Sequence, residues 1–178
     1  FAPQADEPER KKIAEIIWKF HCEAINRYAI FNADPHPGNY IIVDDKVAII
    51  DFRFCKAWDP TFIDLWKKQT LAGCRGDEAG FIQLTREMGF FTTNDQNFLK
   101  NLLPIYQDVF YRPWISDRNF RITHQYLKQY LRTIFEKIVS AGDVHVPIEF
   151  LALTRLYFEV FAIMAHLDIE LNYYQLTI

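Results

Sequence analysis

Three oxygen-bearing side chains in the first third of the chain have a spacing that suits phosphoryl transfer. Asp34 precedes Asn39 by five positions, and Asp51 follows Asn39 by twelve. Phosphoryl transfer needs a carboxylate that positions the attacking hydroxyl and hard oxygen ligands that hold Mg²⁺ against the phosphates of ATP. The order and approximate spacing match the base and the metal ligands of a kinase catalytic loop. We therefore expect Asp34 to be the catalytic base, and Asn39 and Asp51 to bind Mg²⁺.

The segment between Asp34 and Asn39 reads Pro35-His36-Pro37-Gly38 and is predicted to be an ordered loop. Two prolines exclude regular helix and strand, and they restrict the backbone between base and ligand. His36 has two interpretations, a contact with the phosphates of the nucleotide or a purely structural role in bracing the turn. For the three residues together, the alternative without chemistry is a Pro-rich turn capped by Asp34 and Asn39, followed by a strand that ends at Asp51.

The elements around this loop follow from hydrophobic periodicity. Apolar residues at helical spacing predict one long amphipathic helix from Glu9 to about Tyr28, which ends just before the loop. Two β-branched runs, Tyr40 to Val43 and Val47 to Asp51, predict a hairpin that turns at residues 44–46. Such a hairpin would place Asp51 at a strand end and fold it back toward Asn39.

Everything after residue 60 is expected to be helical. The signals are the helix start at Asp59-Pro60-Thr61, the break at Gly73 to Gly76, the restart at Asp77 and the stop at Gly89, followed by helices from about Gln96 to Phe110, Phe120 to Ala141 and Pro147 to Leu167. The predicted fold is mostly α with a small β-hairpin. Residues 1–8 are expected to be a linker, and residues 9–178 one domain that contains the catalytic loop 32–39 and the metal-binding strand end 51–53.

Composition excludes several classes of protein. The 178 residues are 50% hydrophobic and 24% charged with a net charge of −3, which argues for a globular domain and against a nucleic-acid partner. Three cysteines without C-x-x-C spacing indicate neither a disulfide framework nor a zinc site. The most apolar stretch, 150–167, carries Arg155, Glu159 and His166, so a buried helix is expected rather than a membrane span.

The segment from Asn32 to Asn39 and the following Asp51-Phe52 resemble the UbiB/AarF family of atypical kinases, also called aarF-domain-containing kinases. The hallmark of that family is H-A-D-P-H-P-G-N before D-F-G, and this chain reads N-A-D-P-H-P-G-N before D-F-R. The resemblance extends from about residue 9 to 167. It implies the C-terminal lobe of a protein-kinase-like fold, with Asp34 as base, His36, Asn39 and Asp51 at the ATP and Mg²⁺ site, and a link to ubiquinone or isoprenoid lipid metabolism.

Three residues depart from the family pattern. Asn32 stands where the family usually has His, Ala29 stands near a usual Gly, and Arg53 replaces the glycine of D-F-G. Arg53 removes a residue that tolerates positive φ and places a cation beside the expected metal ligand. Arg155 and Glu159, four apart on the last helix, are expected to pair with each other or to support the loop from behind.

The chain carries no G-x-G-x-x-G pattern among its six glycines, and about thirty residues before Asp34 leave no room for the strands of an N-terminal lobe. The isolated lobe is therefore expected to be inactive or weak. Two alternatives to an ATP-dependent kinase remain, a pseudokinase scaffold in a lipid-biosynthesis complex and a phosphotransferase of the aminoglycoside or choline type. The aromatic content of 16% is high, and we expect most of these side chains to pack in the core rather than to bind an isoprenoid or a membrane. The expected location of the protein is the cytoplasm or the periphery of a membrane.

Overall fold

The computed structural model describes residues 5–32, 34–43, 46–90, 96–138 and 147–177. Its α-helices are α1 (Glu7–Tyr28), α2 (Pro60–Arg75), α3 (Glu78–Glu87), α4 (Gln96–Ile105), α5 (His124–Thr133), α6 (Ile148–Leu167) and α7 (Tyr173–Thr177). Two short π-helical turns, Tyr106–Phe110 and Ile134–Ile138, continue α4 and α5. The fold is mostly helical, as the sequence predicts.

In the described ranges, three small antiparallel sheets of two strands each accompany these helices. The strands are β1 (Ile30–Asn32), β2 (Tyr40–Val43), β3 (Lys46–Ile49), β4 (Cys55–Ala57), β5 (Phe120–Arg121) and β6 (Glu170–Leu171), paired as β1–β4, β2–β3 and β5–β6. The predicted hairpin is confirmed as β2–β3, with Tyr40 opposite Ile49. It is shorter than expected, because β3 ends at Ile49 and Asp51 lies beyond the strand.

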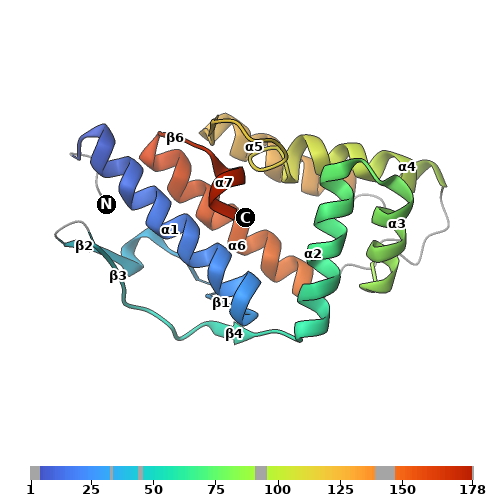
Figure 1. Ribbon diagram of the computed structural model, residues 1–178, viewed down its shortest axis with the longest axis horizontal. Helices are drawn as coiled ribbons and strands as arrows, with labels where there is room; N and C mark the ends of the chain where they lie inside the picture. The colour runs from blue at the N-terminus through green and yellow to red at the C-terminus, as the bar shows by residue number, and fades with distance from the viewer. Residues whose placement is uncertain (1–4, 33, 44–45, 91–95, 139–146, 178) are drawn as a thin grey trace.

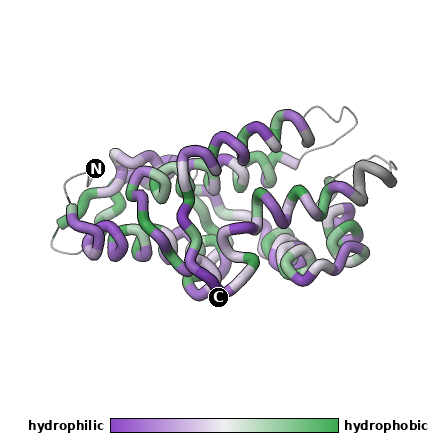
Figure 2. Tube along the Cα trace, turned by 90° about the horizontal axis from the view of Figure 1, so that it is seen from above, coloured by the Kyte–Doolittle hydropathy of each residue, from purple (hydrophilic) through white to green (hydrophobic). Residues whose placement is uncertain are grey.

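Helices α1 and α6 lie side by side and run in opposite directions at the centre of the molecule, and α2, α3 and α4 gather at one end (Figure 1). Hydrophobic and hydrophilic residues alternate along the helical segments (Figure 2), so each helix has an apolar face to bury. The core is strongly aromatic, with Trp18 and Phe161 stacked at 6.1 Å and Trp18 meeting Tyr173 edge-on at 4.6 Å. This confirms that many aromatic side chains pack inward.

Local capping explains the helix limits. Asp6 accepts a hydrogen bond from the backbone N–H of Glu9, and α1 therefore begins two residues before the predicted start. Asp59 and Asp77 cap α2 and α3 in the same way, and Gly76 ends α2 at a φ of 73°. The predicted starts and stops from residue 59 to 89 are confirmed.

The prediction that the chain is helical throughout after residue 60 is wrong at two places. Phe120 and Arg121, expected to open a helix, instead pair with Leu171 and Glu170, and α5 starts at His124 behind its N-cap Thr123. The expected end of that helix near Ala141 and the expected helix opening at residues 93–95 lie outside the described residues. Helix α6 is confirmed, and no helix in the described ranges is both long and apolar enough to cross a membrane.

Candidate active site

The loop that follows β1 is fixed to the rest of the molecule by Asn32. This side chain is buried on β1, where the sheet pairs Asn32 with Cys55 of β4. Its Nδ2 donates to the backbone carbonyl of Asp51 at 2.9 Å, and its Oδ1 accepts from the backbone N–H of Asp34 at 3.0 Å. The amide of Asn32 therefore links the backbone of Asp34, the expected base, to that of Asp51, an expected metal ligand. The UbiB/AarF family usually has His at this position.

The turn itself is a 3₁₀ turn, Pro37–Asn39, capped by His36. Nδ1 of His36 accepts from the backbone N–H of Gly38 at 3.0 Å, and the backbone carbonyl of His36 accepts from the N–H of Asn39 at 2.8 Å. Because Nδ1 accepts, a neutral imidazole carries its proton on Nε2. His36 is exposed and braces the turn, and its Nε2–H is the group that could meet a phosphate.

Asn39 holds the loop closed from the other end. Its Nδ2 donates to the backbone carbonyl of Asp34 at 3.1 Å, and its own backbone carbonyl accepts from the N–H of Ile50 at 3.0 Å. The first bond uses the amide nitrogen, so Oδ1 is the side-chain oxygen of Asn39 that could bind a metal. The second bond places Asn39 next to the chain that leads from β3 to Asp51.

The carboxylate of Asp34 is half-buried and lies beside α6. Its Oδ1 is 3.6 Å from Nη2 of Arg155, while its backbone groups bond to Asn32 and Asn39. Of the two roles expected for Arg155, the structure shows the contact that supports the loop. The sequence signal was a single arginine in a largely apolar helix, and only the fold shows which acid it meets.

Asp51 is held by Arg53. The Asp51 carboxylate accepts from Nε of Arg53 at 3.1 Å, from Nη2 at 2.6 Å and from the Arg53 backbone N–H at 2.9 Å. These hydrogen bonds, and the positive charge, lower the pKa of Asp51 to about 2. The Arg53 side chain is 81% exposed, so the clamp closes over Asp51 from the solvent side.

The same guanidinium responds to both acids of the site. The pKa of Arg53 is raised mainly by Asp51, and Asp34 adds to the shift through its charge. Asp34 therefore lies within electrostatic range of the guanidinium that holds Asp51. Arg53 also has no backbone strain, because Ala29 and Asp168 are the only non-glycine residues with positive φ in the described part of the chain.

The candidate site offers only a few oxygen ligands to a metal ion. No three His, Cys, Asp or Glu side chains gather to hold a metal ion within the ranges that the structure describes. Asn39 and Asp51 offer one amide oxygen and one carboxylate, which suits Mg²⁺ that keeps several waters and takes further oxygens from a nucleotide. The residues fit Mg²⁺ by their chemistry, but Arg53 occupies the carboxylate that the metal would need.

Comparison with known proteins agrees with the resemblance found in the sequence. Residues 2–85 match the family described as the ABC1 atypical kinase-like domain. The fold is similar to that of Rv3197 from Mycobacterium tuberculosis, solved in complex with erythromycin, with a TM-score of 0.78 and 18% identity. That alignment covers 98% of this chain and 44% of Rv3197, so the chain spans less than half of that protein. No curated protein sequence matches the chain.

The matched region contains the helix α1, the loop after β1, the hairpin and Asp51. The loop residues that carry the resemblance are thus inside the matched range, and the similarity in fold extends beyond it to the helical remainder. Residues 2–85 of this chain match the ABC1 atypical kinase-like domain, and this match confirms the recognition of a UbiB/AarF-type atypical kinase-like domain.

Proposed function

We propose that this chain carries the catalytic loop and the metal-binding segment of an atypical kinase or ATPase that uses Mg²⁺ and ATP. The supporting observation is the hydrogen bonding of Asn32, which joins the backbones of Asp34 and Asp51. Together with the bond from Ile50 to Asn39, it keeps the candidate base and the two candidate metal ligands on adjacent stretches of chain. Kinase-like chemistry depends mainly on such positioning and on charge neutralisation at the phosphates.

Each residue has a defined role in this proposal. The Asp34 carboxylate accepts the proton of the attacking hydroxyl or orients a water, and Arg155 holds it in place. Oδ1 of Asn39 and the Asp51 carboxylate would hold Mg²⁺, which supplies charge neutralisation for the β- and γ-phosphates when bound. His36 would offer Nε2–H to a phosphate oxygen. The acceptor is proposed to belong to ubiquinone or isoprenoid lipid metabolism, on the resemblance to the UbiB/AarF family alone.

We propose further that residues 9–178 form the C-terminal lobe of the kinase-like fold. A protein kinase binds the phosphates of ATP with a Gly-rich loop and a Lys of its N-terminal lobe. Residues 1–178 contain no such glycine pattern. We expect residues 1–178 to bind Mg·ATP weakly and to turn it over slowly or not at all. Calorimetry and a phosphate-release assay test this, and saturable ATP binding with steady hydrolysis by these residues alone would contradict it.

A pseudokinase is the second candidate, and the clamp of Arg53 on Asp51 favours it. An arginine that neutralises the metal-binding carboxylate lowers the attraction of the site for Mg²⁺. In the longest natural chain that contains this segment, Asp34→Asn separates the two functions. Loss of ATP turnover with an unchanged fold supports the enzyme. Retention of every cellular function by that variant supports the scaffold.

A further inference from the structure

An open cavity of about 470 Å³ lies between α1, α2, α6, α7 and the segment of Trp114 and Ile115. This volume is within the range of small-molecule binding sites in proteins. The lining residues that matter here are Trp18, Trp66, Trp114, Tyr157, Lys67 and Arg75. None of them takes part in the proposed phosphoryl transfer.

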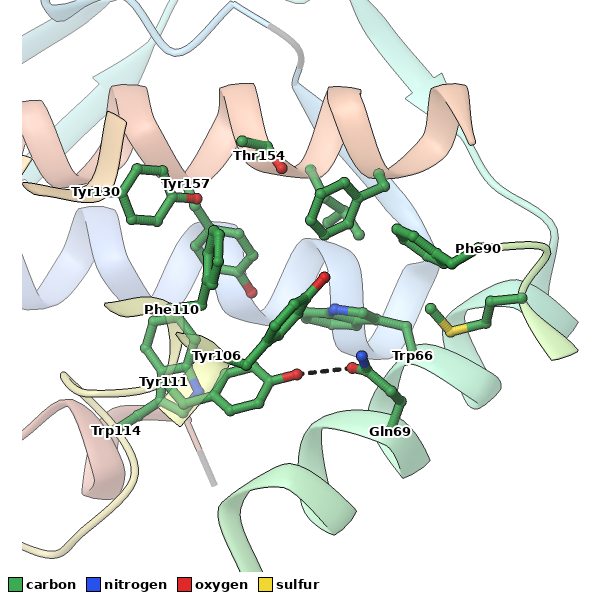
Figure 3. Close-up of a pocket in the computed structure, with 13 residues that line it drawn as sticks. Trp66, Gln69, Phe90, Tyr106, Phe110, Tyr111, Trp114, Tyr130, Thr154 and Tyr157 are labelled. Carbon is green, nitrogen blue, oxygen red and sulfur yellow. Dashed lines mark hydrogen bonds between the residues drawn. The ribbon is translucent and has the colours of Figure 1, made fainter. Parts of the chain in front are cut away.

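The apolar wall of this cavity is a continuous row of aromatic rings. The ring centroids of Trp66 and Tyr157 are 6.1 Å apart, those of Tyr157 and Trp114 are 5.4 Å apart, and those of Trp114 and Trp18 are 5.8 Å apart. Trp66, Trp114 and Tyr157 are half-buried and also line a second, smaller cavity of about 30 Å³ (Figure 3). The three rings thus lie between a small cavity and a large one, and the large cavity leaves room for a flat apolar molecule against them.

The polar part of the cavity is positively charged. Lys67 and Arg75 both come from α2, and Nζ of Lys67 is held at 2.5 Å by the backbone carbonyl of Asn26. The described lining residues include no acid, and neither cation forms a salt bridge with an acid of the described ranges. Cys74, also in the wall, has a thiol whose pKa is raised to about 11 by burial, so it adds no negative charge at neutral pH. An anionic group would therefore find unopposed positive charge beside the aromatic wall.

We propose that this cavity binds a small amphipathic organic anion, with an aromatic or compact apolar body against the row of rings and a carboxylate, sulfonate or phosphate beside Lys67 and Arg75. The row of aromatic rings would contact the apolar part of the ligand, and Lys67 and Arg75 would attract its anionic group. The proposal does not depend on the phosphoryl-transfer function, because it involves neither the loop nor Asp51.

The probe for the test is 1-anilinonaphthalene-8-sulfonate, and the neutral control is N-phenyl-1-naphthylamine, which has the same rings without the sulfonate. Energy transfer from tryptophan reports binding at the cavity, since Trp18, Trp66 and Trp114 line it. We expect one saturable site for the sulfonate, with roughly tenfold weaker binding of the neutral compound, the size of one charge-assisted contact. Lys67→Met should weaken the sulfonate roughly tenfold and leave the neutral compound unchanged.

Lys68→Met is the matched control, because Lys68 is the next residue of α2, is exposed and does not line the cavity. Cys74→Phe fills the cavity and should abolish binding of both compounds, with circular dichroism as the check on folding. Equal binding of the sulfonate by the wild type and Lys67→Met would overturn the proposal. It would also be overturned if vesicles of phosphatidylcholine and phosphatidylserine sedimented the protein and displaced the probe, because the occupant would then be a membrane surface.

Discussion

At the scale of single residues, the distinctive feature is the pair of arginines that accompany the two acids of the site. Arg155 reaches Asp34 from α6, and Arg53 clamps Asp51 from within the same segment. The sequence showed Arg53 at the glycine position of D-F-G and predicted a cation beside the expected metal ligand, Asp51. It could not show a bidentate contact, because the direction of an exposed arginine depends on the backbone around it.

Removal of this clamp should strengthen binding of a divalent cation. Arg53→Gly deletes the side chain that competes for Asp51, and we expect the Kd for Mn²⁺ to fall roughly fivefold, the size of a surface salt bridge. Arg53→Lys keeps the positive charge without the planar guanidinium, and its Kd for Mn²⁺ should lie between those of the wild type and Arg53→Gly. Electron paramagnetic resonance of free Mn²⁺ measures all three affinities. An unchanged Kd in Arg53→Gly would show that Arg53 does not compete with the metal.

At the scale of elements, the end of α1 carries a strained residue. Ala29 caps the helix at φ 51° and ψ 34°, where a Cβ is unfavourable, and the resembling family has a nearby glycine. Ala29→Gly should raise the free energy of unfolding by about 0.5–1 kcal/mol. The matched control is Ala24→Gly, inside the same helix, which should lower it by about 1 kcal/mol. Urea denaturation measures both, and destabilisation by Ala29→Gly would contradict the assigned backbone.

Helix α1 is joined to the hairpin by a buried histidine. Nε2 of His21 lies 2.7 Å from the hydroxyl of Tyr40 on β2, and burial lowers the pKa of His21 to about 4. The unfolded chain takes up this proton near pH 6.5 and the folded protein only near pH 4, so folding stability falls as the pH drops through that window. Over the whole window the free energy of unfolding should fall by about 3 kcal/mol.

Denaturation at pH 7 and at pH 4.5 tests this dependence. His21→Gln should remove most of the loss of stability between the two pH values. His124→Gln, at an exposed position, should leave the loss as it is in the wild type. A wild-type-like loss in His21→Gln would mean that other groups cause it.

The elements differ in how far sequence predicts them. Long helices such as α1 and α6 carry several turns of apolar periodicity, and aspartate and glycine caps mark the limits of α2 and α3. The short strands were missed for a physical reason. Phe120–Arg121 and Glu170–Leu171 are two residues each, too short for a periodic pattern, and they form only because the tertiary fold brings positions fifty residues apart together.

At the scale of the whole molecule, the site lies on the strand-containing edge of a helical body. The ordered turn between Asp34 and Asn39 was predictable because its two prolines and its glycine constrain the backbone, while the chemistry of the loop stays a prediction. The open cavity was not, since its wall combines side chains of four helices and of Trp114 and Ile115, which are distant in sequence. The similarity to Rv3197 covers nearly the whole of this chain, so the site and the cavity lie on one shared architecture.

A titration of Mn²⁺ into the wild type, Asp51→Asn, Asp34→Asn and Asp64→Asn tests the proposed metal site most directly. Asp51→Asn should bind at least about tenfold more weakly, because it loses the only carboxylate assigned to the metal. Asp34→Asn should change little, since Asp34 is assigned to proton transfer, and Asp64→Asn on the exposed side of α2 should match the wild type. Equal Mn²⁺ affinity in the wild type and Asp51→Asn would contradict the site.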